Sequence, residues 1–115
     1  MAEQNIANVT TIYGRTVRIG SIGNLEQDRL TCGTNQIIKI NTVLATNTGN
    51  VNAAISLRYG TDAFIAKNIY IPPNSSIAVV GKDTPIYLME GHALRAVSGL
   101  GTVDVIISYE VILTS

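Results

Sequence analysis

The sequence predicts an all-β protein built as a two-sheet antiparallel β-sandwich of eight or nine strands. Apolar residues recur at every second position in several segments, most clearly at the odd positions from 103 to 113. Turn-forming residues interrupt the chain about every ten residues, which is typical of sandwiches and barrels. No segment combines a helical period with end caps. We expect jelly-roll or Greek-key connections, although the sequence does not fix the strand order.

The segment from Thr102 to Leu113 is expected to be a central strand of the sandwich. Its inward face is predicted to carry Val103, Val105, Ile107, Tyr109, Val111 and Leu113. Burial of these side chains contributes about 9 to 18 kcal/mol, which is similar to the conformational entropy lost when the segment becomes ordered. The strand must therefore pair on both edges, and the absence of proline agrees with a central position. Ile106 and Ile112 lie on the even side, so part of that face should be covered as well.

The other strands are bounded by Gly, Asn, Asp and Pro. We expect them at residues 10–19, 36–46, 51–59, 63–71, 76–80, 86–88 and 93–98. The polar segment from Leu25 to Cys32 fits either a short helical turn or an edge strand. Pro72 and Pro73 follow the strand at 63–71 and should end it, because proline cannot continue a strand ladder.

Three local features of the strands are also predicted. Gly14 is expected to mark a bulge or bend, Gly20 to Gly23 a turn, and Asn47 to Asn50 the loop of a hairpin. Simple alternation in the strand at 36–46 divides its side chains between two faces. One face is predicted to hold Ile38, Ile40 and Leu44, and the other Ile37, Lys39, Asn41 and Val43.

Length and composition predict one domain at residues 10–115, preceded by an N-terminal arm at residues 1–9. Apolar residues make up 46% of the chain and charged residues only 14%, which favours a subunit that buries outer surface in an assembly. Eight basic and eight acidic residues cancel, and no Lys/Arg run is present. Nucleic-acid binding is therefore disfavoured. No targeting or membrane-spanning segment is recognisable, so we expect synthesis in the cytosol and no membrane partner.

The residue types needed for catalysis or metal binding are scarce. His92 is the only histidine and Cys32 the only cysteine, so a hydrolase would have to use His92, and a structural zinc site is excluded. The carboxylates at or near predicted turns are Asp62, Asp83, Glu90 and Asp104. Turn chemistry explains them better than a catalytic pair or a calcium site. We expect no enzyme activity, catalytic residue, metal or cofactor.

A carbohydrate-binding module is an alternative from another functional class. The five tyrosines are Tyr13, Tyr59, Tyr70, Tyr87 and Tyr109. Their scatter among apolar strand positions favours packing in the core and at interfaces. If the protein instead binds host glycans, Tyr59 and Tyr87 are the predicted contacts.

Several stretches of the chain carry a resemblance to a known class of proteins. They are Ile12-Tyr-Gly-Arg15, the strand from Ile37 to Val43 running into Ala45-Thr-Asn47, Ile71-Pro-Pro73, Pro85-Ile-Tyr-Leu-Met-Glu-Gly91 with Leu94-Arg95, and Ile107-Ser-Tyr-Glu110. Together they resemble small β-sandwich virion proteins of tailed bacteriophages of cyanobacteria and marine bacteria. The resemblance covers most of residues 10 to 113, and it implies a structural subunit of the phage particle without catalytic residues.

The resemblance and the composition together indicate a capsid decoration, or cement, protein located in the virion. Such a protein binds and stabilises the shell of the major capsid protein, here as a homotrimer or another symmetric oligomer. A neck or tail ring subunit, or a fibre accessory, is the nearest alternative. The residues expected to contact partners, in the arm and on the outer surface, are Ile6, Val9, Arg15, Arg18 and Arg58.

Overall fold

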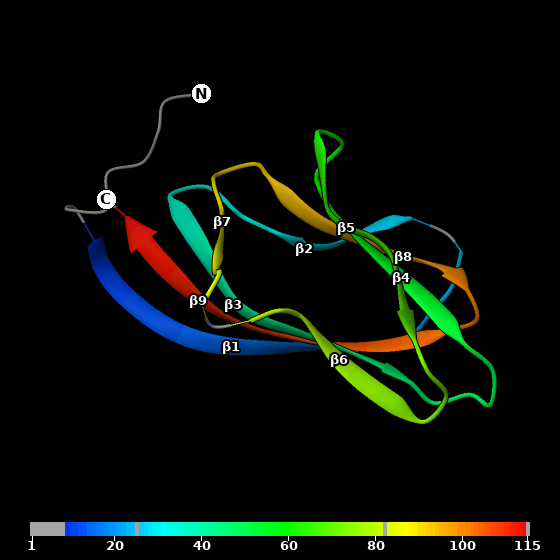
Figure 1. The fold of residues 1–115 in the computed structure, drawn as a ribbon. Helices are drawn as coiled ribbons and strands as arrows, with labels where there is room; N and C mark the ends of the chain where they lie inside the picture. The colour runs from blue at the N-terminus through cyan, green and yellow to red at the C-terminus, as the bar shows by residue number, and fades with distance from the viewer. Residues whose placement is uncertain (1–8, 25, 82, 115) are drawn as a thin grey trace.

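The computed structural model describes residues 9–24, 26–81 and 83–114 and confirms the predicted β-sandwich (Figure 1). The described residues form nine strands and no helix. The strands are β1 (Val9–Ile22), β2 (Gln27–Thr31), β3 (Gln36–Asn47), β4 (Ala53–Tyr59), β5 (Ala63–Ile71), β6 (Ser75–Val80), β7 (Ile86–Leu88), β8 (Ala93–Leu100) and β9 (Val103–Thr114).

The strands form two antiparallel sheets that pack face to face. We call them sheet A, with the order β1-β9-β3-β6 and with β7 also paired to β3, and sheet B, with the order β2-β8-β4-β5. The long strand β9 lies between β1 and β3 (Figure 1). The C-terminal strand is therefore central and paired on both edges, as its sequence predicts.

The strand order distinguishes between the two predicted topologies. Because β6 and β7 both pair with β3, they act as one interrupted strand. The pairs β4·β5, β3·β6/β7, β2·β8 and β1·β9 are then nested within one another along the chain. A long hairpin that is rolled up gives this arrangement, which is the jelly roll.

The core lies between the two sheets and is lined by alternate residues of each strand. In β9, five of the six predicted inward residues are buried, namely Val103, Val105, Ile107, Tyr109 and Val111, and the sixth, Leu113, is half-buried. On the opposite face of β9, Ile112 is 6% exposed and Ile106 is 42% exposed. The even side is thus covered at Ile112, as predicted, but not at Ile106.

The start and end of β1 differ from the prediction. Val9 belongs to the strand, whereas residues 1–8 of the predicted arm, including Ile6, lie outside the described residues. Gly14 pairs in regular register with Glu110, so it marks no bulge; the irregularities fall between Val9 and Thr11 and between Ile19 and Ile22. The predicted turn at 20–23 is wrong for its first three residues, because the strand continues to Ile22, which is 1% exposed. Burial of Ile22 holds the chain on the sheet beyond the irregularity.

A β-bulge in β3 reverses the predicted faces in the second half of that strand. The register with β9 shifts between Ile40 and Thr42. An extra residue moves every following side chain to the opposite face. Val43 is therefore fully buried, while Leu44 is 42% exposed on the outer face; the prediction that Leu44 shares a face with Ile38 is wrong.

The predicted hairpin at Asn47–Asn50 is also wrong, because β3 and β4 lie in different sheets. The segment carries the chain from sheet A to sheet B. Buried Asn47 organises the crossing: its Nδ2 donates to the carbonyl oxygens of Val51 at 2.6 Å and Ile71 at 3.0 Å, and its Oδ1 accepts from the Gly49 amide.

One ambiguity is resolved in favour of strand structure, and two features around β5 are as the sequence predicts. The segment that fits a helical turn or an edge strand contains β2, at the edge of sheet B. The strand before Pro72 ends at Ile71, as expected. The turn at residues 60–62 joins β4 and β5, which pair as a true hairpin.

Candidate functional site

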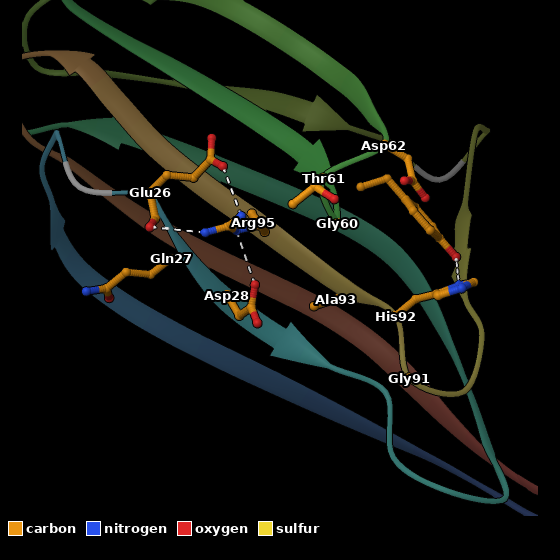
Figure 2. A pocket seen from close by; sticks show the side chains of 11 residues that line it. Glu26, Gln27, Asp28, Gly60, Thr61, Asp62, Gly91, His92, Ala93 and Arg95 are labelled. Carbon is orange, nitrogen blue, oxygen red and sulfur yellow. Dashed lines mark hydrogen bonds and ion pairs between the residues drawn. The ribbon is translucent and has the colours of Figure 1, made fainter.

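A hollow with a volume of about 570 Å³ lies beside the edge strand β2 (Figure 2). It is lined by the start of β2, the β4–β5 turn and the start of β8. Three of the lining residues are small, namely Gly60, Gly91 and Ala93. Because these residues fill little space between larger neighbours, the surface is hollowed here.

Ion pairs form one wall of the hollow. Arg95 of β8 contacts Glu26 at 3.3 Å and Asp28 at 3.2 Å (Figure 2). Arg58 of β4 contacts Glu26 at 3.5 Å. Strand pairing places Arg58 directly opposite Arg95, which would be unfavourable for two like charges alone. Glu26 offsets this repulsion by contacting both guanidinium groups. The groups are partly exposed, so each pair contributes at most about 1 kcal/mol to stability.

Tyr59 and His92 form the other end of the site. The Tyr59 hydroxyl lies 2.7 Å from His92 Nδ1 and 3.1 Å from the carbonyl oxygen of Tyr87, and it accepts from the Met89 amide at 3.5 Å. The two rings meet edge-on, with centroids 5.3 Å apart. The Tyr59 hydroxyl therefore connects the end of β4 by hydrogen bonds to β7 and to the turn before β8.

Removal of this hydroxyl should loosen that end of the sandwich. We expect Tyr59→Phe to lower the free energy of unfolding by about 1 to 2 kcal/mol, because the Tyr87 carbonyl and the imidazole lose their partner. Urea denaturation followed by circular dichroism measures the change. The matched control is Tyr70→Phe, since Tyr70 is 66% exposed, and it should change stability by less than about 0.5 kcal/mol. Equal effects of the two variants would contradict the assignment.

The structure brings Cys32 close to His92 along the backbone but gives their side chains separate partners. The Cys32 amide donates to the His92 carbonyl at 2.9 Å, whereas the buried thiol donates to the Gln36 carbonyl at 3.1 Å. Burial raises the pKa of the Cys32 thiol, which is the opposite of what activates a nucleophile. The geometry therefore offers no support for the hydrolase alternative.

The four turn carboxylates are dispersed over the molecule. Asp62 lines the hollow, Glu90 accepts from the Asn35 amide at 2.6 Å, and Asp104 accepts from the Ser21 amide at 2.8 Å. Asp83 is exposed in the turn between β6 and β7. Among the described residues, no group of His, Cys, Asp and Glu is placed to hold a metal ion. Likewise, those residues contain no helix that could span a membrane.

The predicted contact residues fall on two different sheets. Arg15 and Arg18 are exposed on β1 of sheet A, and the Arg15 guanidinium lies 4.9 Å from the centroid of the Tyr13 ring. Arg58 is on sheet B, where it contacts Glu26 and lies 4.9 Å from the centroid of the Phe64 ring. The structure therefore does not gather these arginines into one surface. The side chains of Ile6 and Val9 are not described.

Sequence reasoning missed two features of the surface. The first is the cluster of Glu26, Asp28 and Arg95, whose only signal was the polar character of the segment before Cys32. The second is the extent of exposed apolar surface. Among the residues that the structure describes, the exposed large apolar side chains are those of Ile12, Leu44, Val51, Phe64, Ile69, Tyr70, Tyr87 and Ile106.

No protein-family model and no curated protein matches the chain. Among solved structures, the fold is similar to that of a Bacillus endospore appendage protein, described as belonging to a novel family of disulfide-linked pili. The TM-score is 0.52 at 15% sequence identity, and the match covers 90% of this chain and 88% of the other. At this identity, the similarity supports the sandwich fold alone.

Proposed function

We propose that the protein is a non-enzymatic structural subunit of a bacteriophage particle, most specifically a decoration protein that binds and stabilises the capsid shell. The observation that carries the proposal is the exposed apolar surface on both sheets. Leu44 and Ile106 lie directly opposite each other on the outer face of sheet A. Exposed apolar side chains that adjoin one another on a surface mark sites of interaction.

The second sheet carries apolar surface of its own. On the edge strand β5, Phe64 is 44%, Ile69 36% and Tyr70 66% exposed. A subunit with apolar patches on two sheets can contact two neighbours at once, which suits a protein that bridges repeated capsid subunits. The jelly roll is also common in viral capsid proteins. This analogy of fold adds to the argument from the apolar surface and does not replace it.

A filament subunit is a second candidate, because the similar solved structure is that of a pilus protein. That protein belongs to a family of disulfide-linked pili. The 115 residues contain one cysteine, which could join only two copies, and its thiol is buried. A filament of this chain would therefore be held by non-covalent contacts between sandwiches.

Cryo-electron microscopy of phage particles with and without the protein tests the proposal. We expect repeated sandwich density on the outside of the shell, and a lower disruption temperature for shells that lack the protein. Density confined to the neck or tail would support the ring or fibre alternative instead. Unchanged density and unchanged stability would overturn the role in the particle.

A charge-bearing variant tests the apolar surface itself. The double variant Leu44→Glu/Ile106→Glu should lose binding to shells that lack the protein. The control Thr48→Glu/Asn50→Glu adds the same charge at exposed polar positions in the crossing between the sheets, and it should bind normally. Folding of both variants is checked by circular dichroism.

A further inference from the structure

The free edge of β1 is long and regular. From Thr11 to Ile19, the strand pairs with β9 without a shift in register, which makes an edge about 30 Å long. No described strand pairs with its other edge. The segment Val9–Ile22 also contains no proline. An unpaired edge of this kind is a template for an added strand.

The other described sheet edges are interrupted. Strand β2 has five residues and a register shift between Asp28 and Leu30. Strand β5 is irregular opposite Leu57, and its Asn68 has a φ of 53°. The remaining edge, of sheet A, is divided into β6 and β7. Natural proteins protect edges by such devices, so β1 is the exception among these strands.

The charge of β1 indicates which segment could add to it. The strand carries Arg15 and Arg18 and no carboxylate. Neither arginine forms an ion pair with a described residue. The two residues are three positions apart, so their side chains leave the sheet on opposite faces. An incoming strand with carboxylates at the same spacing would meet one arginine on each face.

A second copy of the chain offers no such strand among the described edges. Strands β5, β6 and β7 contain no carboxylate, and pairing β1 with itself would bring four arginines together. The carboxylates at β2, Glu26 and Asp28, already contact Arg58 and Arg95. Charge complementarity therefore favours a different protein as the partner.

We propose that the free edge of β1 receives an extended acidic segment of another protein, which adds as a further antiparallel strand of sheet A. Main-chain hydrogen bonds would supply the pairing, and Arg15 and Arg18 would select carboxylates three residues apart. The inference deepens the proposed function and rests on it, since it names the chemistry by which a structural partner would be held.

Nuclear magnetic resonance titration of the full chain tests the proposal. The probe is the acetylated, amidated peptide Thr-Val-Glu-Thr-Val-Glu-Val-Thr, and its control carries Lys in place of both Glu residues. We expect amide shift changes along Thr11 to Ile19, and affinity about tenfold lower for the control, because two exposed ion pairs are together worth about 1.4 kcal/mol. The double variant Arg15→Gln/Arg18→Gln should weaken binding of the acidic peptide about tenfold. The matched control Lys39→Gln/Lys67→Gln removes the same charge elsewhere and should not.

In the titration, any of three results would overturn the proposal: no shift at millimolar peptide, equal affinity for both peptides, or shifts centred on another edge. Self-association that protects the β1 amides from hydrogen exchange would also overturn it, because the edge would then belong to a second copy. The titration needs no phage particle, so its failure is distinct from failure of the proposed function. Conversely, if the protein binds the acidic peptide but is absent from phage particles, the binding site at β1 is confirmed and the proposed role in the capsid is wrong.

Discussion

Substitution of Ile107 by alanine should lower the free energy of unfolding by about 2 to 5 kcal/mol. Ile107 lies at the middle of β9, is fully buried, and belongs to the core cluster between the sheets. The loss combines the burial of the removed methyl groups with a cavity that the neighbouring strands cannot close, because β9 is paired on both sides. Urea denaturation of the purified protein measures the change.

The adjacent residue provides a matched control for this prediction. Ile106 has the same side chain and belongs to the same strand, but it lies on the outer face and is 42% exposed. Ile106→Ala should therefore cost less than about 1 kcal/mol. Equal losses for the two variants would show that the outer face of sheet A is as buried as the core, which would contradict the alternation of β9.

This alternation is also the part of the fold that the sequence predicts best. A strand that is buried on one face must place apolar residues at every second position, and β9 does so over its buried length. The central position of β9 follows from energetics, because a strand of this apolar content is unstable without partners on both edges. The existence of β9 and its pairing on both edges can therefore be predicted from the alternation of apolar residues alone.

The errors in β3 and at Asn47 have a different origin. A bulge adds one residue to a strand and has no distinctive sequence. Strict alternation therefore places Leu44 and Val43 on the wrong faces of β3. The segment after β3 contains the residues of a hairpin loop, yet the chain changes sheet there. Whether a loop returns along its own sheet or crosses to the other depends on contacts with distant strands, and these are absent from local sequence.

The hollow beside β2 could not be predicted for a related reason. Its lining comes from three separate segments, at residues 26–28, 59–62 and 91–95. They meet only because β8 lies between β2 and β4. The polar character of the segment around Glu26 and Asp28 indicates a surface position, but the arginines that these residues contact are determined by the strand order, which the pattern of residues leaves open.

Asn47→Ala should destabilise the protein by about 2 to 4 kcal/mol, although the residue lies next to a loop. Its side chain is 2% exposed and bonds to the carbonyl oxygens of Val51 and Ile71 and to the Gly49 amide. Buried backbone groups that lose their partners keep the full cost of desolvation, about 1 to 3 kcal/mol each. Because Val51 lies just before β4 and Ile71 ends β5 at the paired open end of the β4–β5 hairpin, the loss would loosen the crossing between the two sheets.

Two further variants separate the hydrogen bonds of Asn47 from its volume. Asn47→Asp keeps the shape of the side chain but removes the Nδ2 donor and places a carboxylate against two carbonyl oxygens, so it should be at least as destabilising as alanine. Asn50→Ala is the control, because Asn50 is exposed three residues further along the same crossing, and its effect should stay below about 0.5 kcal/mol. Thermal and urea denaturation of the three variants measure these differences. If Asn47→Asp were as stable as the wild-type protein, the donor would not be what holds the crossing, and the buried amide would serve only to fill space between the sheets.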